Sequence, residues 1–213
     1  MAAQSSLARG PARRRRDPDR KERILAAAAA LGAGRGFDAI SMADIGAEAG
    51  IVGSGVYRHF DSKTAILVAM ADRVMDRLMT RTAAIIAAPL DERQRLSLLV
   101  RDHIEAALTD HRDALAVYHR EVRTLPADER RRLSRLQRDY IEEWVRQLAP
   151  LRPDLADSEA RLAVHAAIGA IQSTLFYRTG IADDRLAGLL EVMAHACLGI
   201  TPAPDEEWTG PSY

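Results

Sequence analysis

The stretch DIGAEAGIVGSGVYRHFDSK, from Asp44 to Lys63, indicates how the N-terminal part of the chain folds. It predicts a short amphipathic helix that buries Ile45 and Ala49, a glycine turn at Gly50, and a second short helix that carries residues 56–60, each helix being about eight residues long. Two helices this short are stable only when they pack on other helices. In such a helix-turn-helix unit the second helix is the one that enters the major groove of DNA. The helix before this stretch is expected to end at glycines 32, 34 and 36.

Residues on both sides of this stretch extend the pattern in a fixed order. They read Gly36-Phe37, Ser41, Ala49-Gly50-Ile51, Tyr57-Arg58-His59-Phe60 and Lys63. With these motifs, residues 20–70 resemble the DNA-binding head of the TetR family of bacterial repressors. The resemblance implies an all-α protein, with a helix-turn-helix head over residues 18–63 and a helical bundle for effector binding and dimerisation over residues 64–200.

Within the head, the resemblance implies that Tyr57, His59 and Lys63 contact the DNA backbone. Their polar groups suit phosphate contacts, whereas Ser54 and Arg58 are the better candidates for contacts with bases. Ser41 is also expected to cap the first helix of the motif together with Asp44. The full set of candidate DNA-binding residues is Arg15, Arg16, Ser41, Met42, Gly53, Ser54, Gly55, Tyr57, Arg58, His59 and Lys63.

The charge distribution is compatible with DNA binding at one end of the molecule. The net charge is zero, but residues 1–63 hold eleven basic against seven acidic residues, so the remainder is acidic. Residues 1–17, with the run Arg13–Arg16, predict a disordered basic arm. That arm is either a solvated tail or a segment that contacts phosphates or a minor groove.

Composition excludes several other classes of protein. The single cysteine, Cys197, permits no internal disulfide, and no apolar run approaches the roughly 20 residues that span a bilayer. Without a signal-peptide pattern, the chain is expected to be cytoplasmic and not associated with a membrane. The six histidines lack metal-binding spacing and no nucleophile elbow is present, so we expect no metal site, no cofactor and no enzymatic activity.

Helical periodicity continues to residue 200, and no alternating strand pattern occurs. A long helix over residues 63–87 is expected to link head and bundle, and residues 201–213 form a polar tail. The helix expected from residue 157 to about 179 is apolar on nearly all sides, so it requires cover on two sides. The resemblance places a dimer interface on the last two helices, for which the candidates are Ile168, Ile171, Leu175, Leu189 and Met193.

The resemblance also implies a small-molecule pocket among the middle helices. Its candidate lining residues are His103, Tyr118, Val122, Tyr140, Trp144, Gln172 and Phe176, although each could equally be ordinary core. Residues 116–145 are loosely similar to TetR proteins that sense fatty-acyl or sterol-CoA thioesters. In that case Arg123 and the cluster Arg130–Arg132 are candidates for contacts with the phosphates of the ligand.

The sequence therefore predicts a ligand-responsive transcriptional regulator, most simply a repressor that binds a palindromic double-stranded DNA operator as a homodimer. Its effector would be small and hydrophobic, such as an acyl-CoA or another lipid-like molecule. Two alternatives stay open. A glycine-rich recognition helix with few polar side chains also fits a sequence-tolerant architectural DNA-binding protein, or a helical enzyme or binding protein whose head no longer binds DNA.

Overall fold

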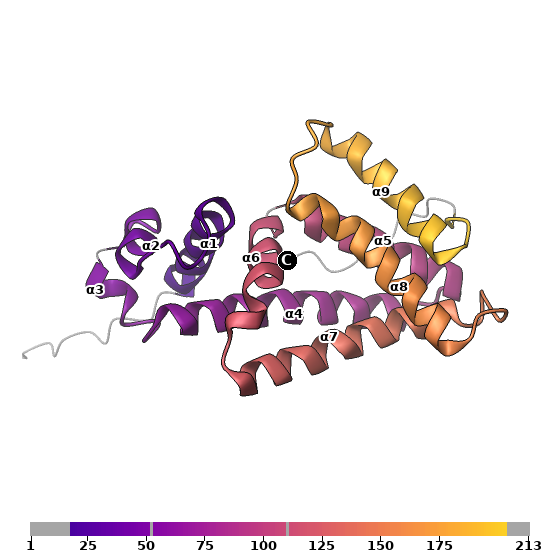
Figure 1. Ribbon diagram of the computed structural model, residues 1–213, viewed down its shortest axis with the longest axis horizontal. Helices are drawn as coiled ribbons and strands as arrows, with labels where there is room; N and C mark the ends of the chain where they lie inside the picture. Colours follow the sequence, from indigo (N-terminus) through magenta and orange to yellow (C-terminus); the bar gives the residue numbers. More distant parts are fainter. Residues whose placement is uncertain (1–17, 52, 110, 204–213) are drawn as a thin grey trace, which may run out of the picture.

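The computed structural model describes residues 18–51, 53–109 and 111–203 of the 213-residue chain (Figure 1). The fold is all-α, as predicted, and no strand occurs in these ranges. The head comprises α1, α2 and α3, and the bundle follows from α4 onward (Figure 1). The helices are α1 (Pro18–Arg35), α2 (Met42–Glu48), α3 (Gly53–Val56), α4 (Lys63–Ala87), α5 (Glu92–Leu108), α6 (Arg112–Glu121), α7 (Ala127–Leu148), α8 (Asp157–Gln172) and α9 (Asp183–Leu198), with 3-10 turns at Val122–Thr124 and Ser173–Leu175.

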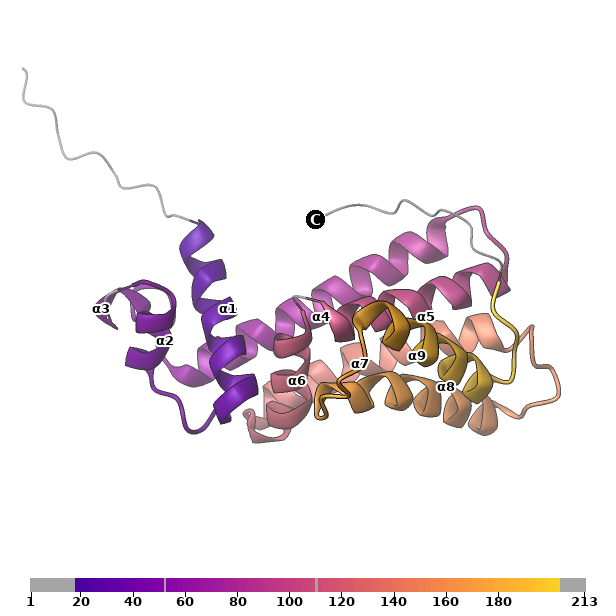
Figure 2. The ribbon, with the colours of Figure 1, turned by 90° about the horizontal axis from the view of Figure 1, so that it is seen from above.

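Helix α4 belongs to both parts of the molecule and crosses from the head into the bundle (Figures 1 and 2). It starts where expected, because the Ser62 hydroxyl accepts a hydrogen bond from the Ala65 N–H at 3.0 Å and caps the helix. The first part of its apolar stripe packs on α1, and the later part packs on α5, α6 and α7. Because α4 has buried residues along its whole length, this one helix packs firmly in both the head and the bundle and connects them.

Two glycines in the head adopt conformations that other residues rarely adopt. Gly50, with φ +65°, makes the turn after α2, and Gly36, with φ +85°, ends α1. Gly32 was expected to help end α1 but lies inside it. A Cβ atom there would lie 3.1 Å from side-chain atoms of both Phe37 and Val117, so this glycine allows α1 and α6 to approach closely.

The two C-terminal helices pack side by side on the outside of the bundle (Figures 1 and 2). Helix α8 ends at Gln172, about two turns earlier than expected, and the chain continues through a 3-10 turn. Arg112 of α6 holds this turn by donating to the carbonyl oxygen of Thr174 at 2.8 Å. The expected polar tail begins with an ordered contact, in which the Ala203 N–H donates to Ser97 Oγ at 2.9 Å, and residues 204–213 lie outside the described part.

No helix among the described residues has the length and hydropathy needed to cross a membrane. The same residues contain no group of three or more histidine, cysteine, aspartate or glutamate side chains arranged to hold a metal ion.

Candidate functional site

The surface that the head presents for DNA is formed by the end of α3 and the turn that follows it. Tyr57 is 57% exposed and Arg58 is also exposed, whereas Val56 and Phe60 on either side are buried in the head. His59 is half-buried beside them. The buried side chains of Val56 and Phe60 therefore fix this segment in the head, and the polar side chains between them face outward. This is the arrangement expected of a recognition element. The regular helix covers only Gly53–Val56, so it is shorter than the eight or so residues expected.

Ser41 and Asp44 form the expected capping box at the start of α2. The Asp44 N–H donates to Ser41 Oγ at 3.1 Å, and the Ser41 N–H donates to Asp44 Oδ2 at 2.8 Å. The hydroxyl of Ser41 itself donates to Asp44 Oδ2 at 2.7 Å, and this bond lowers the pKa of the Asp44 carboxyl. Because the hydroxyl hydrogen is used within the motif, Ser41 serves the helix before any phosphate.

Lys63 has a structural role that the sequence did not indicate. Its Nζ donates to the carbonyl oxygens of Phe37, Asp38 and Ile40 at 3.0, 3.0 and 3.1 Å. It also lies 5.5 Å from the centre of the Phe37 ring. An ammonium has three donors, and all three hold the loop between α1 and α2 against the start of α4. No donor is left for a phosphate in this conformation.

We therefore predict that Lys63→Met destabilises the protein by about 1 to 3 kcal/mol, because it removes charge-assisted hydrogen bonds while keeping most of the side-chain length. Urea unfolding measures the loss. The matched control is Arg58→Met, an exposed residue for which we expect less than about 0.5 kcal/mol. If the two variants unfold alike and Lys63→Met only weakens DNA binding, Lys63 is a phosphate contact and the structural role is wrong.

The remaining DNA-binding candidates have different outcomes. The Met42 side chain is buried in the head core, so only its backbone at the start of α2 is placed for a contact with DNA. Gly53 and Ser54 lie in α3, but the environment of their side chains is not described, and Arg15 and Arg16 lie outside the described residues. A Cβ atom at Gly55 would lie 2.6 Å from Ile51, so this glycine favours tight packing within the motif.

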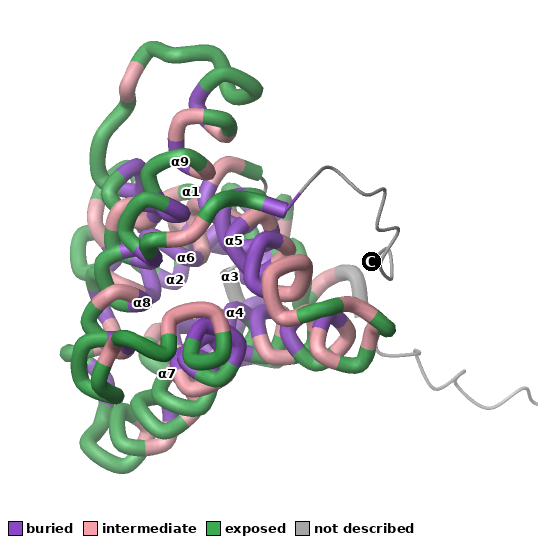
Figure 3. The backbone as a smooth tube through the Cα atoms, turned by 90° about the vertical axis from the view of Figure 1, so that its right-hand side faces the viewer, coloured by how far each residue is buried: buried purple, intermediate pink, exposed green. Residues whose placement is uncertain are grey.

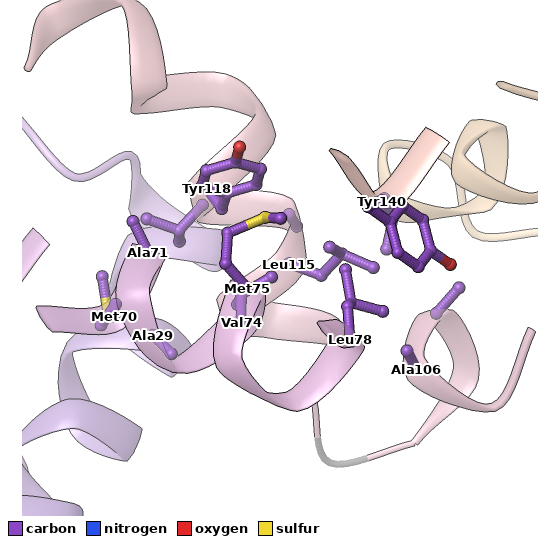
Figure 4. Close-up of a cluster of buried hydrophobic side chains, with 14 of the residues drawn as sticks. Ala29, Met70, Ala71, Val74, Met75, Leu78, Ala106, Leu115, Tyr118 and Tyr140 are labelled. Carbon is purple, nitrogen blue, oxygen red and sulfur yellow. The ribbon is translucent and has the colours of Figure 1, made fainter. Parts of the chain in front are cut away.

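A cavity of about 80 Å³ lies in the bundle between α4, α6, α7 and α8. It reaches the surface beside α8, where its lining residues His165 and Gly169 are exposed. Figure 4 shows part of its wall, with Tyr118 close to Met75 and Tyr140 close to Leu78. The complete lining is Met75, Leu78, Leu115, Tyr118, His119, Gln137, Tyr140, Ile141, His165, Ile168, Gly169 and Gln172.

The structure brings three of the seven ligand candidates together in this wall: Tyr118, Tyr140 and Gln172. Val122 does not line it and begins the 3-10 turn after α6. Phe176 does not line this cavity, because α8 ends before it and leaves its ring exposed under the Arg120 guanidinium, 5.8 Å from the ring centre. The lining residues that the sequence did not single out come mostly from α4 and from α8.

His103 and Trp144 support the wall from behind. His103 Nδ1 lies 2.9 Å from Tyr140 Oη and its Nε2 lies 3.2 Å from Gln172 Nε2, so it joins two lining residues. Trp144 packs edge-on against both the His103 and the Tyr140 ring and is fully buried. Burial lowers the pKa of His103 to about 3, so the imidazole is neutral at physiological pH.

The arginines considered for ligand phosphates are partly engaged within the protein. Arg132 donates to Asp72 at 2.5 Å and to Glu129 at 2.8 Å, which ties α7 to α4. Arg130 donates to the backbone oxygens of Arg123 and Leu125 at 3.3 Å. Neither residue lines the cavity. The cluster is thus primarily a structural feature of the start of α7.

Three of the residues predicted for a dimer interface are covered within the chain itself. Ile168 and Ile171 of α8 and Leu175 of the following 3-10 turn are buried, and Ile168 lines the cavity. Of the two α9 candidates, Met193 is exposed and Leu189 is half-buried. The exposed side of the pair, green in Figure 3, nevertheless carries several apolar or small residues, with His165 among them. We call it the α8–α9 face: Leu162, Ala166, Gly169, Leu189, Val192, Met193 and Ala196.

A helix-turn-helix head with an exposed polar tip, joined by one long helix to a bundle with an internal cavity, defines a DNA-binding transcriptional regulator. Comparison with known families agrees. Residues 24–70 match the bacterial regulatory proteins of the tetR family, and residues 89–176 match the tetracyclin repressor-like C-terminal domain. The chain belongs to the TetR family, a family of transcriptional regulators and not of enzymes.

Individual relatives are similar to parts of the chain. The HTH-type transcriptional repressor KstR2 of Rhodococcus jostii is 37% identical over 106 residues, 50% of this chain and 52% of KstR2. The HTH-type transcriptional activator FasR of Mycolicibacterium smegmatis is 32% identical over 82 residues, 38% of this chain and 37% of FasR. The chain thus aligns with about half or less of these curated relatives.

A solved structure shares the whole architecture. AibR in complex with isovaleryl coenzyme A and operator DNA superposes with a TM-score of 0.70, covering 82% of this chain and 97% of AibR, at 19% sequence identity. At this identity the likeness concerns the fold.

Proposed function

We propose that this protein is a cytoplasmic repressor that binds a palindromic operator as a homodimer and releases it when an acyl-containing effector enters the cavity. The observation that carries the DNA-binding part is the exposure of Tyr57 and Arg58 at the end of α3, between the buried anchors Val56 and Phe60. Tyr57 suits a phosphate contact, and the Arg58 guanidinium suits a guanine edge.

The proposed dimer forms through the α8–α9 face. Leu162 is 69% exposed, Val192 is 65% exposed and Met193 is 52% exposed, which leaves large apolar side chains in water. Their neighbours Ala166 and Ala196 are small and allow close approach of a second pair of helices. An apolar face of this kind supports an interface with two-fold symmetry, and two heads would then fit two half-sites.

The proposed link between effector and DNA is α6. One side of this helix supplies Leu115, Tyr118 and His119 to the cavity wall. Its end reaches the head, where Arg120 Nη1 lies 3.5 and 3.4 Å from the carbonyl oxygens of Gly32 and Ala33 at the end of α1. An effector that displaces α6 would therefore move α1, and it changes operator affinity to the extent that it binds one arrangement better than the other.

An acyl-containing effector is supported by the shared fold and by the wall. AibR, which has this fold, was solved with isovaleryl coenzyme A. The cavity here combines apolar side chains from α4 and α6 with a few polar groups, as sites for partly apolar ligands do. FasR is an activator by name, so the direction of regulation is a separate part of the proposal.

The DNA-binding part is tested by replacing each of two exposed tyrosines with alanine, one at the proposed DNA-binding surface and one on the bundle. Tyr57→Ala is expected to weaken binding to a labelled operator at least tenfold in fluorescence anisotropy, because a phosphate contact beside the recognition element is lost. Tyr177→Ala is the matched control, since Tyr177 is 66% exposed on the bundle, and it should leave affinity unchanged. Equal affinity of both variants and wild type would refute the assignment of the DNA-binding surface.

The architectural alternative is favoured by the glycines of α3, which offer no side chain for base contacts. Excess nonspecific DNA in the same titration distinguishes it. Binding to every sequence with similar affinity would support the alternative, whereas retention of the operator complex supports a specific regulator.

A further inference from the structure

The wall of the cavity is polar in places but carries no strongly ionised side chain. Among its lining residues there is no aspartate, glutamate, lysine or arginine. Burial lowers the pKa of His119, which keeps this imidazole neutral near pH 7. The remaining lining histidine, His165, is exposed on the surface of α8. The interior of the cavity is therefore suited to a ligand group without charge.

Tyr118 stands out within this wall. The residue is 3% exposed, and its Oη is buried without a hydrogen-bond partner in the described protein. Leaving a buried hydroxyl unpaired has a cost in free energy, so a polar group of this kind at a cavity calls for an explanation. A ligand that accepts a hydrogen bond from it would remove that cost on binding.

Tyr140 provides the contrast. Its hydroxyl is paired with His103 Nδ1, and His103 is paired in turn with Gln172. This series of hydrogen bonds holds the Tyr140 hydroxyl in place from behind the cavity wall. Figure 4 shows the hydroxyl groups of the two tyrosines pointing in different directions. Of the two lining tyrosines, Tyr118 is thus the one whose hydroxyl has no hydrogen-bond partner among the described residues.

The size of the cavity limits the ligand group. At about 80 Å³ it is roughly half of the ~150 Å³ engineered cavity that accepts benzene. An isovaleryl group has as many heavy atoms as benzene, so the cavity holds the carbonyl end of a short acyl group as it stands and must widen towards its opening for the rest, whereas a fused ring system would require the helices to separate. The opening lies beside His165 and Gly169. Because Gly169 belongs to the α8–α9 face, the larger, charged part of such a ligand would lie at the edge of the proposed dimer interface.

We propose that Tyr118 determines which effector the cavity accepts, by donating a hydrogen bond to the carbonyl oxygen of a short, uncharged acyl group. The inference rests on the proposed effector-binding role of this cavity. It predicts selection against two related molecules. A free carboxylate would bury its charge without a cation in the wall, and a thioether would leave the Tyr118 hydroxyl unpaired.

The test measures binding by calorimetry to four probes: isovaleryl-CoA, free isovalerate, CoA, and S-(3-methylbutyl)-CoA, the thioether in which CH₂ replaces the carbonyl. The wild-type protein is expected to bind isovaleryl-CoA about tenfold tighter than the thioether, with little binding of isovalerate or CoA. Tyr118→Phe removes the hydroxyl alone. It should weaken the binding of isovaleryl-CoA about tenfold and leave the affinity for the thioether unchanged, so that the preference for the thioester over the thioether disappears.

A second measurement uses the ligand-free protein. Tyr118→Phe should unfold at the same temperature as the wild type or a higher one, because it removes an unpaired buried hydroxyl. The control Tyr140→Phe should unfold at a lower temperature, because it breaks the bond with His103. A lower unfolding temperature for Tyr118→Phe would mean that the hydroxyl already has a partner, and would overturn the proposal.

The proposal is also overturned if wild type does not bind isovaleryl-CoA, if isovalerate binds equally well, or if Tyr118→Phe keeps the preference for the thioester. Operator binding measured on the same preparation separates these failures from the proposed function. Loss of the Tyr118 assignment leaves a protein that still binds its operator specifically, whereas failure of the DNA-binding part removes operator binding itself.

Discussion

Val192→Glu is expected to convert the proposed homodimer into monomers and to weaken operator binding at least 100-fold. The side chain is 65% exposed on α9, beside Met193 on the α8–α9 face. A carboxylate placed there would be desolvated at the centre of an apolar interface and repelled by its symmetry mate. Two linked heads gain affinity because the second half-site is bound intramolecularly, and separate monomers lose this gain.

Size-exclusion chromatography with light scattering gives the oligomeric state, and anisotropy gives the operator affinity. Thr80→Glu is the control, because it adds the same charge to an exposed position of α4 away from the α8–α9 face. It should leave the dimer and the operator affinity unchanged. A Val192→Glu protein that remains dimeric would show that the α8–α9 face is not the interface.

Asp102→Ala is expected to destabilise the bundle by about 3 to 5 kcal/mol. The carboxylate of Asp102 is almost fully buried, 2.7 Å from Arg81 Nε and 3.8 Å from Arg77 Nη1. Both guanidinium groups are themselves largely buried, so the substitution leaves two positive charges between α4 and α5 without their shared counter-charge. Removing one member of a buried ion cluster is costly because the partners stay desolvated.

Urea unfolding followed by circular dichroism measures this loss. The control is Glu143→Ala, which removes the partner of Arg146 in a pair whose arginine is 62% exposed. A pair of this kind contributes at most about 1 kcal/mol, so the control should unfold close to wild type. Equal losses for the two variants would show that the buried cluster has no special role in stability.

Local features of this fold could be predicted from sequence. The Ser41–Asp44 capping box and the start of α4 after Ser62 depend on residues within three positions of each other, so their spacing was sufficient. The turn at Gly50 followed for the same reason, since a left-handed residue after a short helix favours glycine. The resemblance to a known family added the order of the domains.

Contacts between distant residues could not be predicted in this way. Lys63 was expected at the DNA because of its position in the motif, but it bonds carbonyl oxygens 23 to 26 residues earlier in the chain. Gly32 was interpreted as part of a helix stop, yet its role depends on Val117 of α6. Nothing in the local sequence around either residue indicates these partners.

Helix α8 shows the limit of periodicity. The pattern gave two apolar faces but not which of them turns inward, and the face of Ile168 and Ile171 was assigned to the dimer when it forms the core. The same limit explains why the cavity was only partly identified. Tyr118, Tyr140 and Gln172 were recognised as polar groups on apolar helices, whereas Met75 and Gly169 resemble any other small or apolar residue.

Specific operator binding and its release by an acyl effector can both be measured in one experiment. This is anisotropy of the wild-type protein on labelled DNA from upstream of its own gene, with excess nonspecific competitor and near-physiological salt, followed by titration with isovaleryl-CoA. We expect a complex that survives the competitor and dissociates as isovaleryl-CoA is added, but not when CoA is added alone. A complex that the competitor abolishes, both here and on sites selected from random DNA, would contradict this expectation.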